Sequence, residues 1–260
     1  MRYYATVGLK LNPMATKTSE KFSDLYQRAA KRKGGEKALE LLLGKKIIGK
    51  KLHHDKAAQQ SVATLSDDRI LSAFTRQIFK SGFVWRVVEN KWPNFEESFF
   101  NFNIEKVLMM PEEMLERKAA NPDIIRNYNK VKTIKANAQM MFDHQIEHQT
   151  SFAQFIADWP SSDIIGLWAF LKKHGQRLGG NTGPYALRLI GKDTFILSSD
   201  VEAYLRAQKI IDGGLQSKKS LTAIQHFFNQ HQQESGYSLT QLSRLIAFAT
   251  GDNYIQTEIK

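Results

Sequence analysis

The clearest chemical signal in the chain is a glycine-rich stretch over residues 178–186, Leu-Gly-Gly-Asn-Thr-Gly-Pro-Tyr-Ala. Glycines allow a tight turn whose backbone N–H groups approach a phosphate, and a helix beginning near Pro184 would add the free N–H groups of its first turn. Lys172, Lys173, Arg177 and Lys192 flank the stretch. We therefore predict a hairpin that binds the backbone of a nucleic acid without reading its sequence, since phosphates are alike. The predicted contacts are Gly180, Asn181, Thr182, Gly183, Lys172 and Lys173.

Simpler explanations exist for this and two other patterns. The glycine-rich stretch is also consistent with a structural Gly-Pro turn between two helices. Residues 44–51, Gly-Lys-Lys-Ile-Ile-Gly-Lys-Lys, resemble a phosphate-binding loop but lack the Ser or Thr that would hold magnesium, and no strand precedes them. His144 and His148 lie one helical turn apart, and His53 adjoins His54, but their Gln- and Glu-rich surroundings favour a solvated helix end over a metal site. We expect no metal.

Composition limits the class of protein. The chain has 260 residues, 42% of them hydrophobic and 11% aromatic, which is enough for a sizeable core. It has no cysteine, which excludes disulfides, iron–sulfur clusters and thiolate zinc sites and fits a reducing compartment. Residues 1–18 contain no continuous apolar run, so we expect neither a signal peptide nor a membrane span, and a cytoplasmic protein.

The positive charge is concentrated near the N-terminus. The formal net charge is +11, and residues 1–60 carry fourteen Lys and Arg against five Asp and Glu. Clusters such as residues 31–33, 45–46 and 50–51 would attract DNA or RNA, with a strength that falls as salt rises. A solvated basic face that serves solubility is the equal alternative.

The elements that would position these residues are helices almost throughout. Ser66 is a plausible N-cap for a helix with apolar residues at 70, 71, 74 and 78, and a second helix is expected from Phe83 to Trp92-Pro93. Residues 124–141 carry the longest apolar stripe and predict a central core helix. Further starts or caps are predicted at Asn94, Asn103, Pro111, Pro122, Ser151, Asp163, Pro184, Ser199, Ser220 and Leu239. Strand signals are limited to Tyr3–Leu9 and Thr194–Leu197, so we expect a mainly α bundle of roughly ten helices.

Several segments in order resemble the 3-methyladenine DNA glycosylase I family of the helix-hairpin-helix DNA glycosylase superfamily. They are residues 71–85, which end in Phe-Lys-Ser-Gly-Phe-Val-Trp, residues 103–138 with Ile-Ile-Arg-Asn at 124–127, and the glycine-rich hairpin. The similarity covers about residues 66–251, and residues 34–40 and 238–244 resemble a longer subfamily of that name. The resemblance implies a two-lobed helical bundle, with a glycosylase domain over 61–260 and a basic N-terminal extension over 1–60 packed on it.

The resemblance also implies roles for individual residues. Trp85 would form the aromatic wall of a base pocket, where stacking on a cationic alkylated purine contributes about 1–2 kcal/mol. Asp200, at a predicted helix start after the hairpin, would be the catalytic acid, although the better-known branches place that acid nearer Ser198 and the register stays open. The ordinary alternatives are a core tryptophan and a first-turn carboxylate stabilised by the helix dipole.

Two features depart from the family pattern. The shorter members hold the base with a glutamate, and this chain has Gln77 at that position, whose amide can hydrogen-bond a base edge but cannot neutralise a cationic base. The shorter members also carry a zinc site built partly from cysteines, which this chain cannot form.

The function implied by the resemblance is hydrolysis of the N-glycosidic bond of alkylated purines such as 3-methyladenine in DNA. We expect a monofunctional enzyme without a cofactor, acting as a monomer on double-stranded DNA with a damaged base, and no membrane partner. A nonenzymatic DNA-binding protein on the same fold is the alternative, and Gln77 makes it credible. A third possibility is an RNA- or protein-binding module that uses the basic N-terminal residues.

Overall fold

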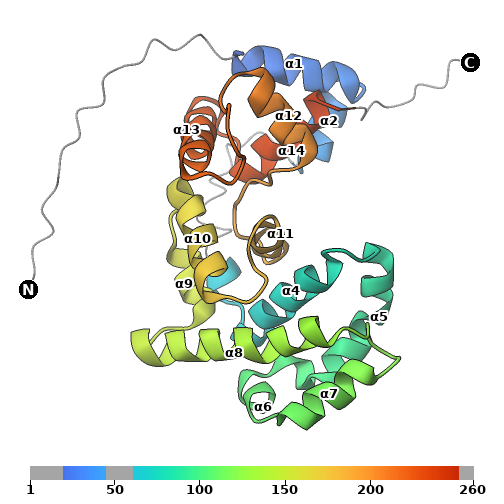
Figure 1. Cartoon of the computed structure of the whole chain (residues 1–260). Helices are drawn as coiled ribbons and strands as arrows, with labels where there is room; N and C mark the ends of the chain where they lie inside the picture. Colours follow the sequence, from blue (N-terminus) through green and yellow to red (C-terminus); the bar gives the residue numbers. More distant parts are fainter. Residues whose placement is uncertain (1–19, 45–60, 252–260) are drawn as a thin grey trace, which may run out of the picture.

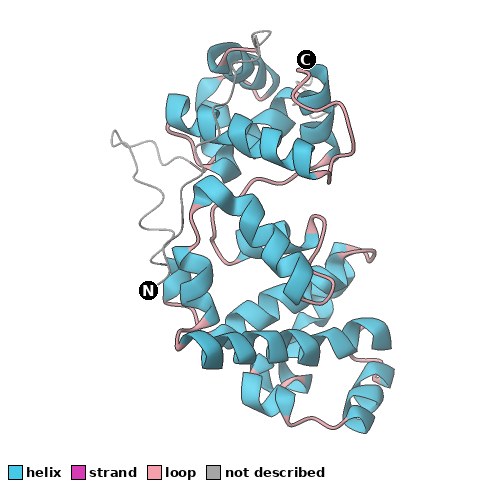
Figure 2. Cartoon of the chain, turned by 60° about the vertical axis from the view of Figure 1, so that its left-hand side comes forward, coloured by secondary structure: helices cyan, strands magenta, loops and turns pink. Residues whose placement is uncertain are grey.

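The computed structural model describes residues 20–44 and 61–251 of the chain, and these residues form helices joined by short loops, with no strand among them (Figures 1 and 2). The expected mainly α fold is confirmed. The α-helices are α1 Phe22–Arg32, α2 Glu36–Leu42, α4 Asp67–Lys80, α5 Trp85–Ser98, α6 Ile104–Leu108, α7 Glu112–Ala120, α8 Tyr128–His148, α9 Phe152–Asp158, α10 Ile164–His174, α11 Thr182–Leu189, α12 Ser199–Ala207, α13 Lys218–Ser235 and α14 Leu239–Ala249. Two 3₁₀ turns, η1 Phe100–Phe102 and η2 Ser161–Asp163, complete the described elements.

The helices form two lobes with a linking region between them (Figure 1). One lobe contains α4 to α8, and the other contains α1 and α2 with α12, α13 and α14, so the start and end of the described chain share a lobe. Helices α9, α10 and α11 lie between the lobes, and α11 packs closely on α4. The hairpin that precedes α11 is therefore held against the α4–α8 lobe.

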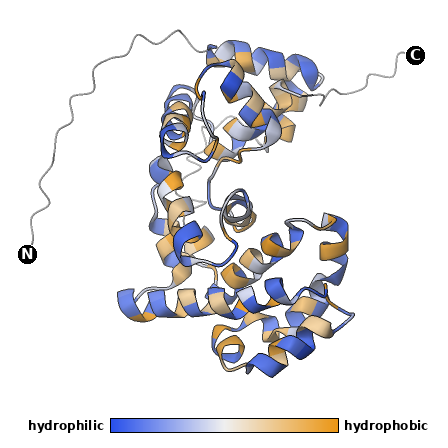
Figure 3. Ribbon diagram, in the orientation of Figure 1, coloured by the Kyte–Doolittle hydropathy of each residue, from blue (hydrophilic) through white to orange (hydrophobic). Residues whose placement is uncertain are grey.

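A continuous apolar core runs through both lobes. Most helices carry hydrophobic and hydrophilic residues together, as amphipathic helices with one buried face do (Figure 3). Aromatic rings supply much of the packing, because a fully buried phenylalanine contributes about 1.5–3 kcal/mol. Phe195 stacks on Phe228 with ring centroids 4.1 Å apart, and Trp92 stacks on Phe102 at 5.5 Å.

Local sequence signals place most helix starts correctly. Helix α4 begins after Ser66, and its predicted apolar residues are all buried. The Asn103 side chain accepts a hydrogen bond from Lys106 N at 3.0 Å, and the Ser151 side chain accepts one from Gln154 N at 3.1 Å. Each of these bonds satisfies one of the free N–H groups at a helix start, which explains the boundary. Helix α8, the predicted central helix, buries Val131, Ile134, Ala138 and Met141.

Some predicted boundaries are wrong because tertiary contacts override local signals. Helix α5 continues through Pro93 to Ser98, since burial of Trp92 and Phe95 outweighs the one helical hydrogen bond that proline cannot make. Asn94 lies inside this helix rather than capping one, and its Nδ2 donates to Asp123 O at 2.9 Å. Pro122 starts no helix, because the cap of α8 is Asn127.

The expected strand at Thr194–Leu197 is also wrong. Residues 192–198 are an irregular segment, although residues 192–197 are buried. Side chains replace the missing strand partner: Thr194 O accepts hydrogen bonds from Arg188 Nη2 and Thr240 Oγ1, both at 3.0 Å, and Leu197 O accepts one from Asn181 Nδ2 at 2.8 Å. An apolar run bounded by polar residues therefore forms a buried loop here.

Several predictions concern residues outside the described part of the chain. They include the strand at Tyr3–Leu9, the pair His53–His54 and residues 45–51 of the phosphate-loop-like stretch. The extent of an N-terminal extension over residues 1–60 also stays a prediction, although its described helices, α1 and α2, pack together and α1 packs on α14. Within the described residues, no helix has the length and apolar character needed to cross a membrane.

Candidate functional site

The hairpin between α10 and α11 depends on glycine at two positions. Gly180 has φ +60°, in the left-handed region that side chains with a Cβ rarely adopt. A Cβ on Gly183 would lie 2.6 Å from the backbone oxygen of Leu178, so only glycine permits the close approach of the two arms. Helix α11 begins at Thr182 rather than at Pro184, which places the proline in the first turn, where an N–H is not needed.

Three exposed cations surround the hairpin. Lys172, Lys173 and Arg177 are exposed and form no ion pair or hydrogen bond with another side chain of the described residues. We call them the hairpin cations. Lys192, which also flanks the hairpin in sequence, is different, because it is buried and donates to Ala157 O at 3.0 Å and to Trp159 O.

Helix α8 fixes the hairpin and the end of α4 relative to each other. Asn137 accepts a hydrogen bond from Gln176 N at 2.7 Å and donates one to Gln176 O at 3.2 Å. Nearer the start of the same helix, the buried Lys130 ammonium donates to Ile78 O at 2.8 Å, to Phe79 O at 3.3 Å and to Ser81 O. Burial, and then the charge of Arg177, lowers the pKa of Lys130. The two walls described next are thus attached to one rigid element.

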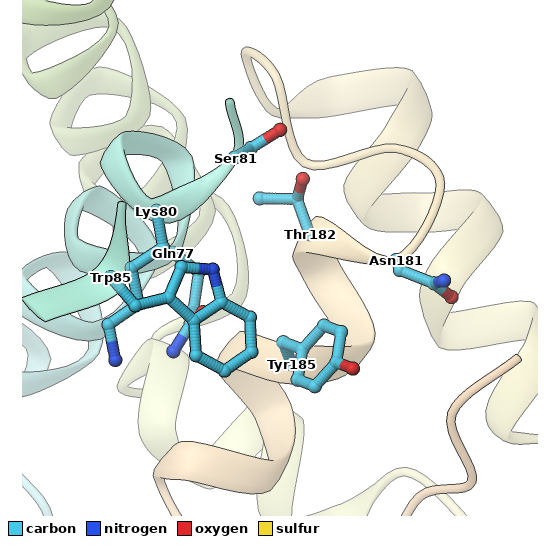
Figure 4. A pocket seen from close by; sticks show the side chains of 7 residues that line it. All are labelled: Gln77, Lys80, Ser81, Trp85, Asn181, Thr182 and Tyr185. Carbon is cyan, nitrogen blue, oxygen red and sulfur yellow. The ribbon is translucent and has the colours of Figure 1, made fainter. Parts of the chain in front are cut away.

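A pocket of about 180 Å³ lies between these walls (Figure 4). Its lining residues are Gln77, Lys80, Ser81, Trp85, Asn181, Thr182 and Tyr185. The first four come from α4 and the turn into α5, and the last three come from the hairpin and α11. The volume suits a single flat ring system better than a drug-sized ligand, whose sites occupy about 300–1,000 Å³.

Two aromatic rings, one from each wall, contact each other at the pocket. Trp85 is 53% exposed, so it is a wall of the pocket rather than a core residue. Its ring and that of Tyr185 are edge to face, with centroids 5.7 Å apart and an interplanar angle of 80° (Figure 4). Such a pair offers a flat guest one face for stacking and one edge for lateral contact.

The Gln77 side chain provides hydrogen-bonding capacity that the protein does not use. It is 8% exposed, and its amide forms no hydrogen bond with any described residue. Asn181 has a second unused acceptor, because its Nδ2 binds Leu197 O while its buried Oδ1 has no partner. Polar groups of low exposure are usually satisfied, so the unused Gln77 amide suits a polar guest in the pocket. The Asn181 side chain instead points away from the two rings, and its Oδ1 is closed to solvent (Figure 4).

A charge cluster adjoins the Gln77 wall. Glu89 forms ion pairs with both Lys80 and Arg76, and the Lys80 ammonium lies 5.3 Å from the centroid of the Trp85 ring. Burial alone would raise the pKa of Glu89, but the hydrogen bond from Lys80 and the charge of Arg76 hold it below its usual value. Glu89 is therefore ionised, and the cluster of two cations and one anion keeps a formal charge of +1.

Asp200 and Ser198 do not line this pocket. Ser198 is the N-cap of α12 and accepts a hydrogen bond from Val201 N at 3.3 Å. Asp200 lies half-buried in the first turn of α12, and its carboxylate is close to Gly251, where a Cβ would lie 2.5 Å from Oδ1. The link between this region and the pocket is Asn181, which lines the pocket and binds Leu197 O. The catalytic role of Asp200 stays a prediction.

Other residues at the site were not identified from the sequence. Lys80 follows Gln77 by three residues on α4 and shares its helix face, which is a usable signal. Tyr185 is in the first turn after the hairpin, but nothing local indicates that it would meet Trp85. Phe83 and Val84 form an exposed apolar turn beside the pocket, 37% and 67% exposed. The second helix was predicted to begin at Phe83, but α5 begins at Trp85, which leaves both side chains in the turn.

The predicted solvated helix end around His144 and His148 is wrong for His144, which is buried, whereas His148 is exposed. His144 is buried against Phe155, with ring centroids 4.2 Å apart, and burial, then the charge of His148, lowers its pKa. The described residues contain no cluster of three or more residues able to hold a metal ion.

Comparison with known proteins bears on the family. Residues 51–176 match the family model for methyladenine glycosylase. The predicted resemblance to the 3-methyladenine DNA glycosylase I family is therefore confirmed over this part of the chain. The match ends before the tip of the hairpin and does not reach Asp200. No curated protein sequence matches the chain.

Comparison with solved structures bears on the fold. The chain is similar to the 8-oxoguanine DNA glycosylase of Methanocaldococcus jannaschii, at a TM-score of 0.54 and 16% identity over 86% of this chain and 92% of that one. The same protein in complex with a 15mer DNA containing 8-oxoguanine gives a TM-score of 0.53, again at 16% identity, over 86% of this chain and 96% of that chain. The 3-methyladenine DNA glycosylase I of Staphylococcus aureus is 22% identical, over 64% of this chain and 92% of that one, at a TM-score of 0.41. The fold is that of a helical DNA glycosylase.

Proposed function

We propose that this chain is a DNA glycosylase that hydrolyses the N-glycosidic bond of alkylated purines, the class to which 3-methyladenine belongs. The observation that supports this most is the pocket itself, because one wall carries Trp85 and the unpartnered Gln77 amide while the other is the hairpin helix. A cavity for a base and a contact for the sugar-phosphate backbone are therefore adjacent. The methyladenine glycosylase match supports the same activity.

Base extrusion is the first step that such an enzyme needs. The glycosidic bond is inaccessible within a duplex, and moving the base out costs a few kcal/mol, less for a damaged base. The hairpin cations and the free N–H groups at the start of α11 would hold the backbone on either side of the lesion. The exposed Phe83 and Val84 are suited to contact the bases that remain stacked, as apolar wedges in other DNA-binding proteins do.

The bond then breaks with positive charge developing on the sugar. A carboxylate near the sugar stabilises such an oxocarbenium-like transition state and orients water. Asp200 is our candidate for this group, with Ser198 as the alternative position. Lys80 is held in an ion pair with Glu89 and so is not placed as a free nucleophile for a Schiff base, which supports a monofunctional enzyme.

A nonenzymatic DNA-binding protein is the second candidate. One observation favours it: among the described residues, none that lines the pocket is acidic. A protein of this kind would bind damaged DNA through the hairpin and the pocket without releasing the base.

Release of free base from alkylated duplex DNA, by wild type and by Asp200→Asn, tests the proposal. Asn keeps the size of the side chain and removes its charge, so release should fall by roughly 10²- to 10⁴-fold. Asp212→Asn is the matched control, because Asp212 is an exposed carboxylate 3.4 Å from the Lys219 ammonium, in the same lobe. Equal release by Asp200→Asn and wild type would remove Asp200 from its role. Binding without release by wild type would favour the second candidate.

A further inference from the structure

The charge of the pocket bears on which alkylated purines it can accept. Alkylation at a ring nitrogen such as N3 or N7 leaves a purine in DNA with a full positive charge, whereas other alkylated purines are uncharged. A site for a cationic base would stabilise it with a nearby carboxylate, since opposite charges at close range favour each other.

The described lining of the pocket carries a positive charge where a site for a cationic base would carry a negative one. It contains one ionisable cation, Lys80, and no acidic residue. The carboxylate nearest along this wall, Glu89, is already shared by Lys80 and Arg76, so the cluster remains positive by one charge. The Lys80 ammonium also lies over the Trp85 ring, at 5.3 Å, and so already interacts with the aromatic surface that a cationic base would use.

The hydrogen-bonding groups of the pocket suit an uncharged base edge. The Gln77 amide carries a donor and an acceptor side by side, and neither is used within the described residues. An adenine-like edge presents the complementary acceptor and donor, and paired amide contacts of this kind are a common means of reading adenine. Gln77 can therefore pair with an uncharged adenine-like edge, and as a neutral amide it adds no charge that would favour a cationic base.

From these observations we propose that the pocket selects uncharged alkylated purines over cationic ones, that Gln77 reads the base edge, and that Lys80 stabilises the base as it leaves. This inference rests on the proposed glycosylase function. The family resemblance led us to expect a site for a cationic base. We infer instead a site of inverted charge, in which the ionisable group of the lining is a cation and the base is neutral.

The chemistry of an uncharged leaving group agrees with this role for Lys80. When the bond between C1′ and the base nitrogen breaks, both electrons stay on the base, which departs as an anion. Water adds to C1′, its oxygen becoming the sugar hydroxyl, and the proton that it loses balances the proton that the base finally takes up. A fixed ammonium beside the base stabilises the anion that forms, whereas a cationic base leaves as a neutral molecule and gains nothing from it.

Two duplexes and two variants test the inference. One duplex carries N6-methyladenine, an uncharged alkylated purine that keeps the N7 acceptor and an N6–H donor, and the other carries 3-methyladenine, which has the same edge with a positive charge. Single-turnover release is measured on each at pH 8. For each base we divide the rate of release by the uncatalysed rate, and we expect this rate enhancement by wild type to be at least tenfold larger for the uncharged base than for the cationic base. Gln77→Glu, which adds a negative charge without changing size, should shift this ratio towards the cationic base by at least tenfold. Lys80→Met should slow release of the uncharged base more than release of the cationic one.

Lys132→Met is the matched control, because Lys132 also places its ammonium over an aromatic ring, 5.8 Å from Tyr128, but lies outside the pocket. The ratio of uncharged-base release to cationic-base release by Lys132→Met should equal that of wild type. Faster relative release of the cationic base by wild type, or an unchanged ratio in both Gln77→Glu and Lys80→Met, would overturn the inference while leaving the glycosylase function intact. Release of neither base by wild type would instead overturn the proposed function and this inference with it. Thermal unfolding of each variant checks that it is folded. If Gln77→Glu does not fold, Lys80→Met still tests the inference.

Discussion

Lysine and arginine do different work in two regions of this molecule. In α1, Arg32 Nε donates to Phe248 O at 3.1 Å and Arg28 Nε donates to Ala249 O at 3.2 Å. At the C-cap of α1, the Lys33 ammonium lies 4.9 Å from the centroid of the Phe248 ring. All three meet the end of α14. The hairpin cations, Lys172, Lys173 and Arg177, are exposed and lack any such hydrogen bond or ion pair with the described residues.

The comparison shows that charge counts do not locate a binding surface. The excess positive charge of the N-terminal residues predicted either attraction of polyanions or a solvated face. Arg28 and Arg32 of α1 instead form a third kind of contact, with the carbonyl groups that end a helix. Lys130 and Lys192 do the same at the ends of α4 and α9. We call Arg28, Arg32, Lys130 and Lys192 the capping cations. A cation that already holds a helix end is not free to hold a phosphate.

The largest effect that this comparison predicts is on stability, at Lys130. Lys130→Met keeps most of the side-chain volume but removes charge-assisted hydrogen bonds to Ile78 O and Phe79 O, each worth about 1.5–3 kcal/mol. We expect the free energy of unfolding to fall by about 3 kcal/mol and Tm by roughly 6–12 °C, given a shift of about 2–4 °C per kcal/mol for a chain of this size. Calorimetry measures both. An unchanged Tm would show that Lys130 is not a capping cation.

Arg32 should give the same kind of effect at smaller size. Arg32→Ala removes hydrogen bonds to Phe248 O and Thr250 O, at 3.1 and 3.3 Å, and exposes the end of α14 to water. Because Arg32 is only partly buried, we expect a loss of about 1.5 kcal/mol in denaturant unfolding, with affinity for undamaged duplex DNA unchanged. The neighbouring exposed Lys31→Ala is the control and should change stability by less than about 0.5 kcal/mol. A fall in DNA affinity for Arg32→Ala without a fall in stability would mean that Arg32 binds DNA and does not cap α14.

The parts of this structure that could be predicted from sequence depend on local physics. The hairpin follows from glycine, because the positive φ at Gly180 favours glycine and the close contact of Gly183 with Leu178 O leaves no room for a Cβ. Helix starts at Asn103 and Ser151 follow from side chains that bind N–H groups three residues ahead. The resemblance to a known family singled out Gln77 and Trp85, which do line one pocket.

The parts that could not be predicted depend on contacts between distant segments. Nothing near Lys130 in the sequence indicates that its ammonium binds Ile78 O, and nothing near Pro93 indicates that buried Trp92 carries α5 past it. The meeting of Trp85 with Tyr185 has the same origin. The inverted charge of the pocket likewise required the pairing of Lys80 with Glu89 to be known.

The hairpin cations should respond in binding rather than in stability. The double variant Lys172→Ala/Lys173→Ala removes two charges that we expect to contact phosphates, so the slope of log affinity against log salt should fall by about 1.8. Stability should change by less than about 0.5 kcal/mol, because both side chains are exposed. Fluorescence anisotropy of a labelled undamaged duplex over a salt series measures the slope. A slope equal to that of wild type would mean that the hairpin does not hold DNA through these lysines.

The smallest predicted effect concerns pH and the role of α1 as a structural element. Tyr26 of α1 donates to Glu40 Oε1 at 2.8 Å, and burial, followed by this hydrogen bond and the Glu40 charge, raises the pKa of Tyr26 to about 12. An unfolded tyrosine ionises near pH 10, so between about pH 10 and 12 the folded state retains a proton that the unfolded state has lost, and stability falls as pH rises. Tyr26→Phe removes this group from the balance.

We therefore expect Tyr26→Phe to lose less stability than wild type between pH 9 and 11, with the denaturant midpoint at each pH as the measurement. Part of the slope should remain, because burial and Glu40 also raise the pKa of Tyr237, whose hydroxyl donates to the same carboxylate. Equal slopes in the two proteins would mean that the Tyr26 hydroxyl ionises as it does in the unfolded chain, and therefore that its hydrogen bond to Glu40 does not join α1 to α2 at high pH. In that case the capping contacts of Arg28 and Arg32 with the end of α14 would be what holds α1 in its lobe.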